Sequence, residues 1–303
     1  MKNLKMIFRI IIGVVFIASA ILKLLSIDHF ELYIYSFGFF NFFLTSLLSR
    51  LLISAEFILG FFLILKLYYS KTWWLTMFTM IGFTLFLIYT ALFRNDANCH
   101  CFGSFIEINP VESIIKNGVI IGLLILIQKQ KESTFKFSRW IASGIVLVTI
   151  SLTFIVVPPD ALFNKMYTPK SKVNEEALLT ILSDSTLQDM NEIHGNHMIA
   201  IFIPGCKFCK LSIQKFAYIF NQNNLNPNKL KIIVLGDQKG VEKFKIETEI
   251  DQFHLYSYQD PIPVIQAVYG SFPTILFLKD QTVIQVINYR GLDENVIINH
   301  VRP

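Results

Sequence analysis

The 303-residue chain has few charged residues. Asp, Glu, Lys and Arg make up 16% of it, against roughly 25% in a soluble globular protein. Hydrophobic residues make up 53%, and the mean hydropathy is +0.51. The composition therefore excludes a soluble or disordered protein, and 14 Gly and 10 Pro are too few for collagen. Four cysteines are too few for a disulfide scaffold of this length.

Nucleotide-binding motifs, phosphate loops and internal repeats are also missing from the sequence, so we expect no cofactor. The net charge of +5 could indicate a nucleic-acid partner. Much of the positive charge, however, lies beside apolar segments, where it is typical of membrane orientation. We therefore expect a lipid bilayer as partner and no nucleic acid.

Long apolar runs are nearly confined to residues 1–157, and residues 158–303 read as a soluble sequence. A helix needs about 20 apolar residues to cross a membrane. The runs predict five spans: Ile7 to Leu25, Leu44 to Leu65, Trp73 to Phe93, Pro110 to Ile127 and Trp140 to Val157. The fourth has the weakest apolar run, but Asn109, Pro110 and Glu112 form a pattern that starts helices.

Basic residues are distributed unevenly over the connecting segments. The start of the chain and the second and fourth loops are basic, through Lys2, Lys5, Arg9, Lys66, Lys71, Lys129, Lys131, Lys136 and Arg139. The loop from Ser26 to Phe43 has no Lys or Arg, and residues 94–109 have only Arg94. Basic loops face the cytoplasm, so five spans place the C-terminal part outside it. Ala18-Ser19-Ala20 also fits a signal-peptidase site, but the apolar run continues to Leu25, and cleavage would leave the downstream orientation unchanged.

The four cysteines form two close pairs, Cys99 with Cys101 and Cys206 with Cys209. The first pair flanks His100 in the outward loop after the third span. The second is a CxxC motif in the soluble part. The predicted topology places both pairs on the extracytoplasmic side, where thiols can be oxidised.

The CxxC motif lies between a predicted strand, His197 to Pro204, and a predicted helix, Lys207 to Phe220. Cys206 is then at a helix N-terminus, where free backbone N–H groups and the helix dipole favour a thiolate. Cys209 is one turn further on, placed to attack a mixed disulfide on Cys206. A redox-active pair is the preferred interpretation, and a metal half-site and an inert structural disulfide are the alternatives.

Further strands are predicted at 231–235, 274–278 and 283–288, with helices at 238–249 and 292–300. This order, the CxxC motif and Phe272-Pro273-Thr274 before a hairpin resemble the thioredoxin-like fold over residues 173–303. The resemblance implies a cis peptide bond at Pro273 beside the cysteine pair. It also implies protein thiols or disulfides as partners.

The membrane half resembles the DoxX/MauE-like family of four-helix membrane proteins over about residues 5 to 130. The resemblance rests on Ala18-Ser19-Ala20-Ile21-Leu22-Lys23-Leu24, Ser54-Ala55-Glu56-Phe57-Ile58-Leu59-Gly60 and Cys99-His100-Cys101-Phe102-Gly103. It implies a redox or disulfide-forming role in the maturation of other proteins, in the bacterial inner membrane. The predicted organisation is a multi-domain membrane protein: a four-span all-α bundle at 1–130, a fifth span and Pro-containing linker at 131–172, and an α/β thioredoxin-like domain at 173–303.

Three interpretations of Cys99-His100-Cys101 stay open. A Cys-x-Cys disulfide closes a small, strained ring and should be easily reduced, so an exchange-active pair is preferred over a metal site and over a structural pair. Glu56 and Lys23 lie in predicted spans, where ionisable groups are expensive. They predict either a structural ion pair or protonated Glu56 between helices, or a path for protons or substrate.

Two functions fit the sequence. The first is a membrane-bound thiol-disulfide oxidoreductase that uses Cys206, Cys209 and Pro273, with Cys99 and Cys101 relaying electrons and a membrane redox partner as a further expectation. The relay predicts an internal Cys99–Cys206 mixed disulfide. The second is a non-enzymatic, MauE-like accessory protein that binds metal through Cys99, His100 and Cys101.

Overall fold

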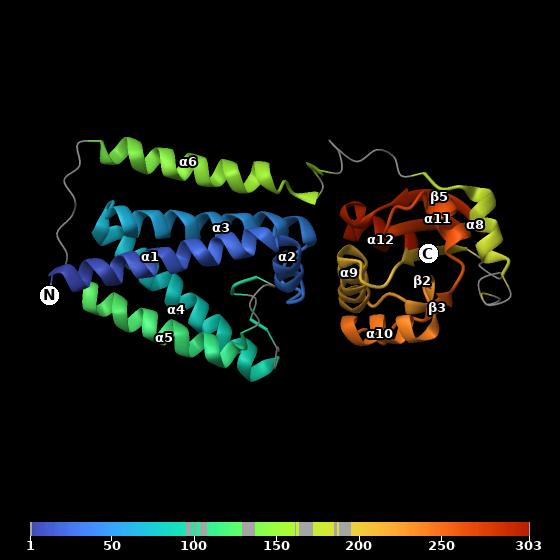
Figure 1. Cartoon of the computed structure of the whole chain (residues 1–303), viewed down its shortest axis with the longest axis horizontal. Coiled ribbons are helices and arrows are strands. Elements are labelled where there is room, and N and C mark those ends of the chain that lie inside the picture. Colours follow the sequence, from blue (N-terminus) through green and yellow to red (C-terminus); the bar gives the residue numbers. More distant parts are fainter. Residues whose placement is uncertain are drawn as a thin grey trace. The chain divides into compact units, whose positions relative to one another are not determined.

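The computed structural model describes residues 2–94, 98–99, 101–103, 108–128, 137–160, 162–163, 172–184, 187 and 195–302 (Figure 1). Two compact units are present: residues 1–34 with 44–158, and residues 35–43 with 159–303. The first is helical and the second is mixed α/β, so the fold class is that predicted from the sequence. The domain limits at 130 and 172 stay a prediction, since residues 129–136 and 164–171 lie outside the described part.

Five helices of the first unit are long and apolar enough to cross a membrane, and the chain is an integral membrane protein. They are α1 (Lys2–Leu25), α3 (Phe42–Leu65), α4 (Tyr69–Phe93), α5 (Pro110–Ile127) and α6 (Ser138–Val156). Each contains one of the five spans predicted from the apolar runs, to within a residue at the C-terminal end. The capping box of α5 is confirmed: Asn109 accepts from the Glu112 N–H, and the Glu112 carboxylate accepts from the Asn109 N–H.

The segment between the first two spanning helices was predicted to be a loop, but it contains a helix. Helix α2 spans Ile27–Tyr35. Its buried apolar residues include Ile27 and Phe30, which pack with Ala20 of α1 and with Phe57 of α3. The i, i+3 spacing of Ile27 and Phe30 is the helical signal, but nine residues with two acids and a histidine are too short and polar to resemble a span.

Helices α1 and α3 approach each other closely at two glycines. A Cβ atom on Gly60 would lie 2.8 Å from the Gly13 carbonyl oxygen, and one on Gly13 would lie equally close to the Gly60 oxygen. Only glycine allows this backbone contact. The contact holds the helix faces together one to three turns further along, where Ser19 and Lys23 of α1 face Glu56 of α3.

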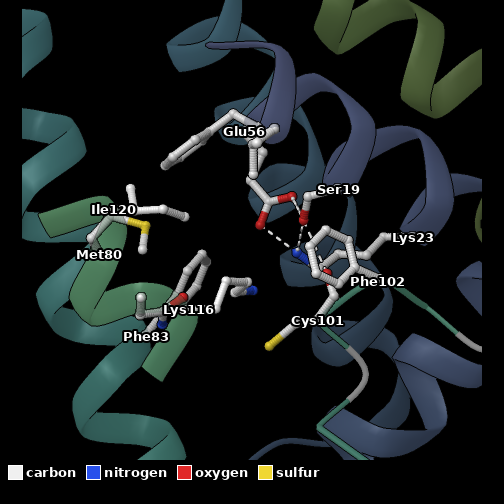
Figure 2. Close-up of a pocket in the computed structure, with 12 residues that line it drawn as sticks. Ser19, Lys23, Glu56, Met80, Phe83, Cys101, Phe102, Lys116 and Ile120 are labelled. Carbon is white, nitrogen blue, oxygen red and sulfur yellow. Dashed lines mark hydrogen bonds and ion pairs between the residues drawn. The ribbon is translucent and has the colours of Figure 1, made fainter. Parts of the chain in front are cut away.

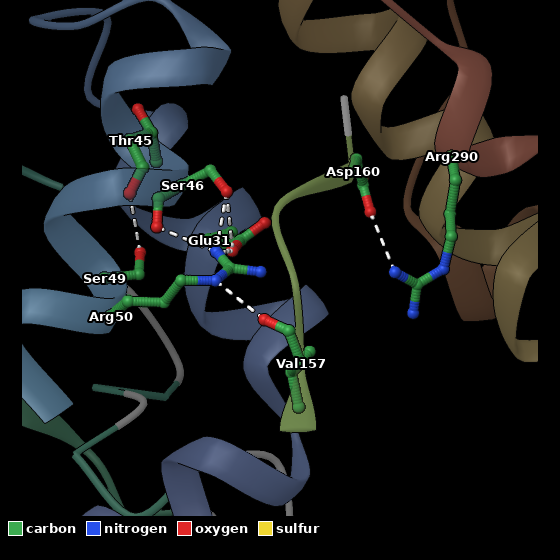
Figure 3. Close-up of polar contacts among 8 residues, drawn as sticks. All are labelled: Glu31, Thr45, Ser46, Ser49, Arg50, Val157, Asp160 and Arg290. Carbon is green, nitrogen blue, oxygen red and sulfur yellow. Dashed lines mark hydrogen bonds and ion pairs between the residues drawn. The ribbon is translucent and has the colours of Figure 1, made fainter. Parts of the chain in front are cut away.

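Polar contacts attach α6 to α3. The hydroxyls of Ser54 and Thr153 lie 2.8 Å apart, and the Arg50 Nε donates to the Val157 carbonyl oxygen at 2.8 Å (Figure 3). Arg50 is 1% exposed and forms an ion pair with Glu31 of α2. Arg50 therefore connects three segments of the first unit.

The second unit contains a five-stranded sheet in the order β3-β2-β1-β4-β5. The strands are β1 (Asn196–Phe202), β2 (Leu230–Leu235), β3 (Leu255–Tyr258), β4 (Thr274–Lys279) and β5 (Thr282–Ile287). Strands β1, β2 and β3 are parallel, whereas β4 and β5 are antiparallel to their neighbours. This is the mixed sheet of a thioredoxin-like fold, with the buried strand β1 at its centre.

The helices of this unit are α8 (Glu175–Leu182), α9 (Lys207–Asn223), α10 (Gln238–Thr248), α11 (Pro261–Val268) and α12 (Glu294–Val301), with short 3-10 turns at Pro227–Lys229 and Tyr289–Gly291. Strand β3 and helices α8 and α11 were not predicted, although the other strands and helices were. One core cluster joins α8 and α11 to the sheet through Ile181, Val264, Ile199 and Leu276. Four residues of β3 are too few for an alternation pattern to be distinguished from chance.

Candidate functional site

Cys206 is the N-cap residue of α9, in the turn that follows β1. Its sulfur accepts a hydrogen bond from the Cys209 backbone N–H at 3.2 Å. Two residues before the first residue of the helix, Gly205 has φ +79°, a conformation that favours glycine and lets the chain turn into α9. Cys206 is partly exposed. The local sequence thus places an accessible sulfur at the end of a helix where an N–H group and the helix dipole favour negative charge.

Cys209 lies in the first turn of α9 and is fully buried. Burial raises the pKa of the Cys209 thiol well above its ordinary value, and the hydrogen bond with the Cys206 sulfur raises it further. At neutral pH Cys209 is therefore held as a thiol. The two cysteines differ in accessibility as a nucleophile and a resolving thiol must.

Pro273 follows a cis peptide bond with Phe272, as predicted. Thr274, the next residue, is paired with Ile201 of β1. Pro273 therefore lies at the end of the sheet from which the chain leaves β1 toward Cys206. Between the two cysteines of the CxxC motif, the ring of Phe208 packs on the ring of Tyr289, with the ring centroids 5.3 Å apart.

Cys99 and Cys101 lie in the segment that connects α4 to α5. The Cys99 N–H donates to the Ile108 carbonyl oxygen at 2.9 Å. This hydrogen bond joins the beginning of the segment to its end, just before α5. Gly103 has φ +67°, and a Cβ atom there would lie 2.7 Å from the Leu22 carbonyl oxygen of α1. Glycine at 103 thus allows the segment to lie directly against the end of α1. All four cysteines are free thiols.

Cys99 is 4% exposed, and its sulfur has polar partners. Its neighbours are the Ser113 hydroxyl at 3.0 Å and the Cys101 N–H, which donates to it at 3.4 Å. A hydrogen bond from the Cys101 thiol, together with those from Ser113 and the Cys101 N–H, lowers the pKa of Cys99 to about 6 against the opposing effect of burial. The same hydrogen bond and burial raise the pKa of Cys101. Cys99 is the more acidic thiol, and Cys101 is the more exposed one.

Glu56 and Lys23 form a buried ion pair, in agreement with the structural pair predicted for them. The Ser19 hydroxyl lies 3.1 Å from the Glu56 carboxylate, 3.0 Å from the Lys23 ammonium and 3.0 Å from the Cys101 carbonyl oxygen. Figure 2 shows this group of contacts beside Cys101. The Ser19 hydroxyl therefore connects the ion pair to the Cys101 carbonyl oxygen of the cysteine segment.

Three further residues of this site were not predicted: Ser19, Ser113 and Lys116. Lys116 lies with its ammonium 4.3 Å from the centre of the Phe102 ring and lines the same cavity as Cys101. In the sequence, Ser19 belonged to a possible cleavage site and to a motif of the DoxX/MauE-like family, but no contact with the cysteines was predicted for it. The metal-binding alternative includes His100, which lies outside the described residues, so it stays a prediction.

Comparison with known proteins gives three similarities. Residues 1–130 match the family described as methylamine utilisation protein MauE. Protein TlpB of Flavobacterium psychrophilum is 25% identical over 280 aligned positions, covering 76% of each chain. A solved structure, a secreted Mycobacterium tuberculosis disulfide oxidoreductase homologous to E. coli DsbE, is 13% identical and covers 37% of this chain and 84% of its own, with a TM-score of 0.29. The N-terminal 130 residues thus match the MauE membrane family, and the chain is similar to TlpB over most of its length.

Proposed function

We propose that this protein is a membrane-anchored thiol-disulfide oxidoreductase of the bacterial inner membrane. Cys206 and Cys209 exchange disulfides with protein thiols on the extracytoplasmic side, and electrons pass between this pair and Cys99–Cys101. The observation that carries the proposal is the asymmetry of the CxxC pair. Cys206 is accessible, and its sulfur accepts a hydrogen bond from the Cys209 N–H at the N-terminus of α9. Cys209 is buried, and its pKa is raised.

The asymmetry of Cys99 and Cys101 supports one order of the exchange steps. The more acidic thiol is the better leaving group, and the more exposed sulfur is the easier one to attack. The Cys206 thiolate attacks Cys101, so a Cys101–Cys206 bond forms, the Cys99–Cys101 bond breaks and Cys99 leaves as a thiolate. Cys209 then loses its proton and attacks Cys206, and Cys101 leaves and takes up a proton. Two electrons and one proton are transferred from the CxxC pair to the Cys99–Cys101 pair.

Two trapping variants test this relay in the full chain in nanodiscs. The variant Cys99→Ser with Cys209→Ser, treated with glutathione disulfide as the two-electron oxidant, should accumulate a Cys101–Cys206 mixed disulfide, identified by mass spectrometry of a non-reduced digest. The variant Cys101→Ser with Cys209→Ser should accumulate less of the Cys99–Cys206 bond, which the sequence alone predicted. This difference is expected because Cys99 is buried and Cys101 is partly exposed.

The same experiment contains its own control, because Cys206 remains able to capture external disulfides in both variants. Capture of an added glutathione disulfide by Cys206, with no internal bond in either variant, would contradict the relay. A higher yield of Cys99–Cys206 than of Cys101–Cys206 would reverse the proposed order of attack.

The extracytoplasmic location is supported by the basic loops and the five spanning helices. A C-terminal alkaline phosphatase fusion should be active, since this enzyme requires an oxidising compartment to form its disulfides. A fusion after Gln130, in the fourth loop, should be inactive. Activity of the Gln130 fusion together with an inactive C-terminal fusion would reverse the orientation and contradict the compartment proposed for both cysteine pairs.

A further inference from the structure

A small cavity lies in the first unit beside the Cys99–Cys101 segment. Its volume is about 40 Å³, enough for ordered water, since one water needs roughly 10–15 Å³. Side chains of α1, α3 and α5 line it together with the cysteine segment, and α4 contributes only Met80 and Phe83 (Figure 2). Its ionisable residues are Lys23, Glu56, Cys101 and Lys116.

The charges around this cavity do not cancel when both cysteines are uncharged. Lys23 and Glu56 neutralise each other, because their side chains are paired and only 6% and 5% exposed. Among the described residues, Lys116 has no carboxylate within ion-pair distance, and its ammonium contacts the Phe102 ring. Counted over the described residues that line the cavity, one positive charge is therefore left over, on Lys116, which is half-buried beside the cysteine segment.

A thiolate at Cys99 would balance that charge. The Cys99 sulfur already faces the Ser113 hydroxyl and the Cys101 N–H, which stabilise negative charge on it. The positive charge of Lys116 acts on both Cys99 and Cys101 in the same sense, favouring their ionised forms. In the disulfide form neither sulfur is charged, so the surplus positive charge has no counterpart.

We propose that Lys116 is a positioning residue for the Cys99–Cys101 pair. Its positive charge favours the reduced form of the pair, with a Cys99 thiolate, and this makes the pair the oxidising partner in thiol exchange. A pair whose reduced form is stabilised is a stronger oxidant. The inference rests on the proposed function, and it gives the relay a direction: electrons pass from Cys206–Cys209 to Cys99–Cys101. Glu56 has a separate part, since it is the counter-charge of Lys23, whose positive charge also favours ionised Cys101.

The test uses full-length protein with Cys206→Ser and Cys209→Ser, so that Cys99 and Cys101 are the only cysteines. Equilibration in glutathione redox buffers gives the reduction equilibrium constant. Lys116→Met should lower it about tenfold, which corresponds to a potential about 30 mV more negative, and Lys116→Arg should restore most of the loss. Glu56→Gln should shift the constant in the opposite direction, because it leaves Lys23 without its counter-charge.

A second readout is the ultraviolet absorbance of the thiolate in the reduced protein over a pH series. The midpoint for Cys99 should rise with Lys116→Met and fall with Glu56→Gln. Lys71→Met removes the same charge from an exposed position in the first turn of α4, at the opposite end from Cys99, and should change neither quantity. An unchanged potential and midpoint in Lys116→Met, or shifts of the same sign in Lys116→Met and Glu56→Gln, would overturn the inference.

These measurements are independent of Cys206. If the Lys116 and Glu56 shifts have the expected opposite signs but neither trapping variant forms an internal bond, Lys116 has its assigned role and the relay to Cys206 is wrong. If the trapped bond forms and Lys116→Met shifts nothing, the relay stands and the role of Lys116 is wrong.

Discussion

Replacing Cys206 with serine is expected to abolish disulfide exchange between the protein and its clients. Cys206 is the accessible sulfur of the CxxC pair, and a serine hydroxyl is not ionised at neutral pH. Cys209 cannot take over the attack, because it is fully buried and its pKa is raised. The rate of reduction of a fluorogenic disulfide peptide by the purified, reduced protein should fall to that of the peptide without protein.

Cys209→Ser is the matched variant, since it removes the other thiol of the pair. In a background with Cys99→Ser and Cys101→Ser, this protein should attack the peptide once and then stop as a stable mixed disulfide on Cys206, because no thiol remains to resolve it. Cys99→Ser should leave the first turnover of the reduced CxxC pair unchanged. Retention of activity in Cys206→Ser would assign the attack to another cysteine and contradict the proposed site.

The elements that the sequence predicted correctly are those with a strong local signal. Apolar runs of about 20 residues identified the five long helices, and Asn109, Pro110 and Glu112 located the start of α5. The strand-turn-helix around Cys206 was also predictable, because the sulfur and the N–H that it accepts are only three residues apart. Helix α2 was missed because its stability comes from packing on α1 and α3 rather than from its own composition.

The environment of Cys99 and Cys101 could not be predicted in the same way. Its members are distant in sequence: Ser19 lies 82 positions before Cys101, and Lys23 lies 33 positions before Glu56. They meet because Gly13, Gly60 and Gly103 allow close backbone contacts between their segments. The requirement that buried charges be paired predicted the contact between Lys23 and Glu56, but this rule gives no information about a hydroxyl group such as that of Ser19.

Arg50 carries the second large expected effect, on stability. It lies in the third turn of α3, was not identified from the sequence, and is almost fully buried. Besides its ion pair with Glu31, it donates to the Ser46 carbonyl and hydroxyl at 2.8 and 2.6 Å and to the Val157 carbonyl at 2.8 Å (Figure 3). Arg50→Met should lower the free energy of unfolding by about 3–5 kcal/mol, because removing one member of a buried pair leaves the other charge unpaired.

Unfolding in mixed micelles with increasing dodecyl sulfate, followed by circular dichroism, would measure this loss. Arg139→Met is the control, since Arg139 is exposed on α6 and such surface changes usually stay within about 0.5 kcal/mol. The double variant with Glu31→Gln should lose less than Arg50→Met alone, because the unpaired Glu31 carboxylate accounts for much of the cost. A double variant that is less stable than Arg50→Met would contradict this explanation, because it would show that the Glu31 carboxylate stabilises the protein even without Arg50, for example through the hydrogen bond that it accepts from the Ser46 hydroxyl.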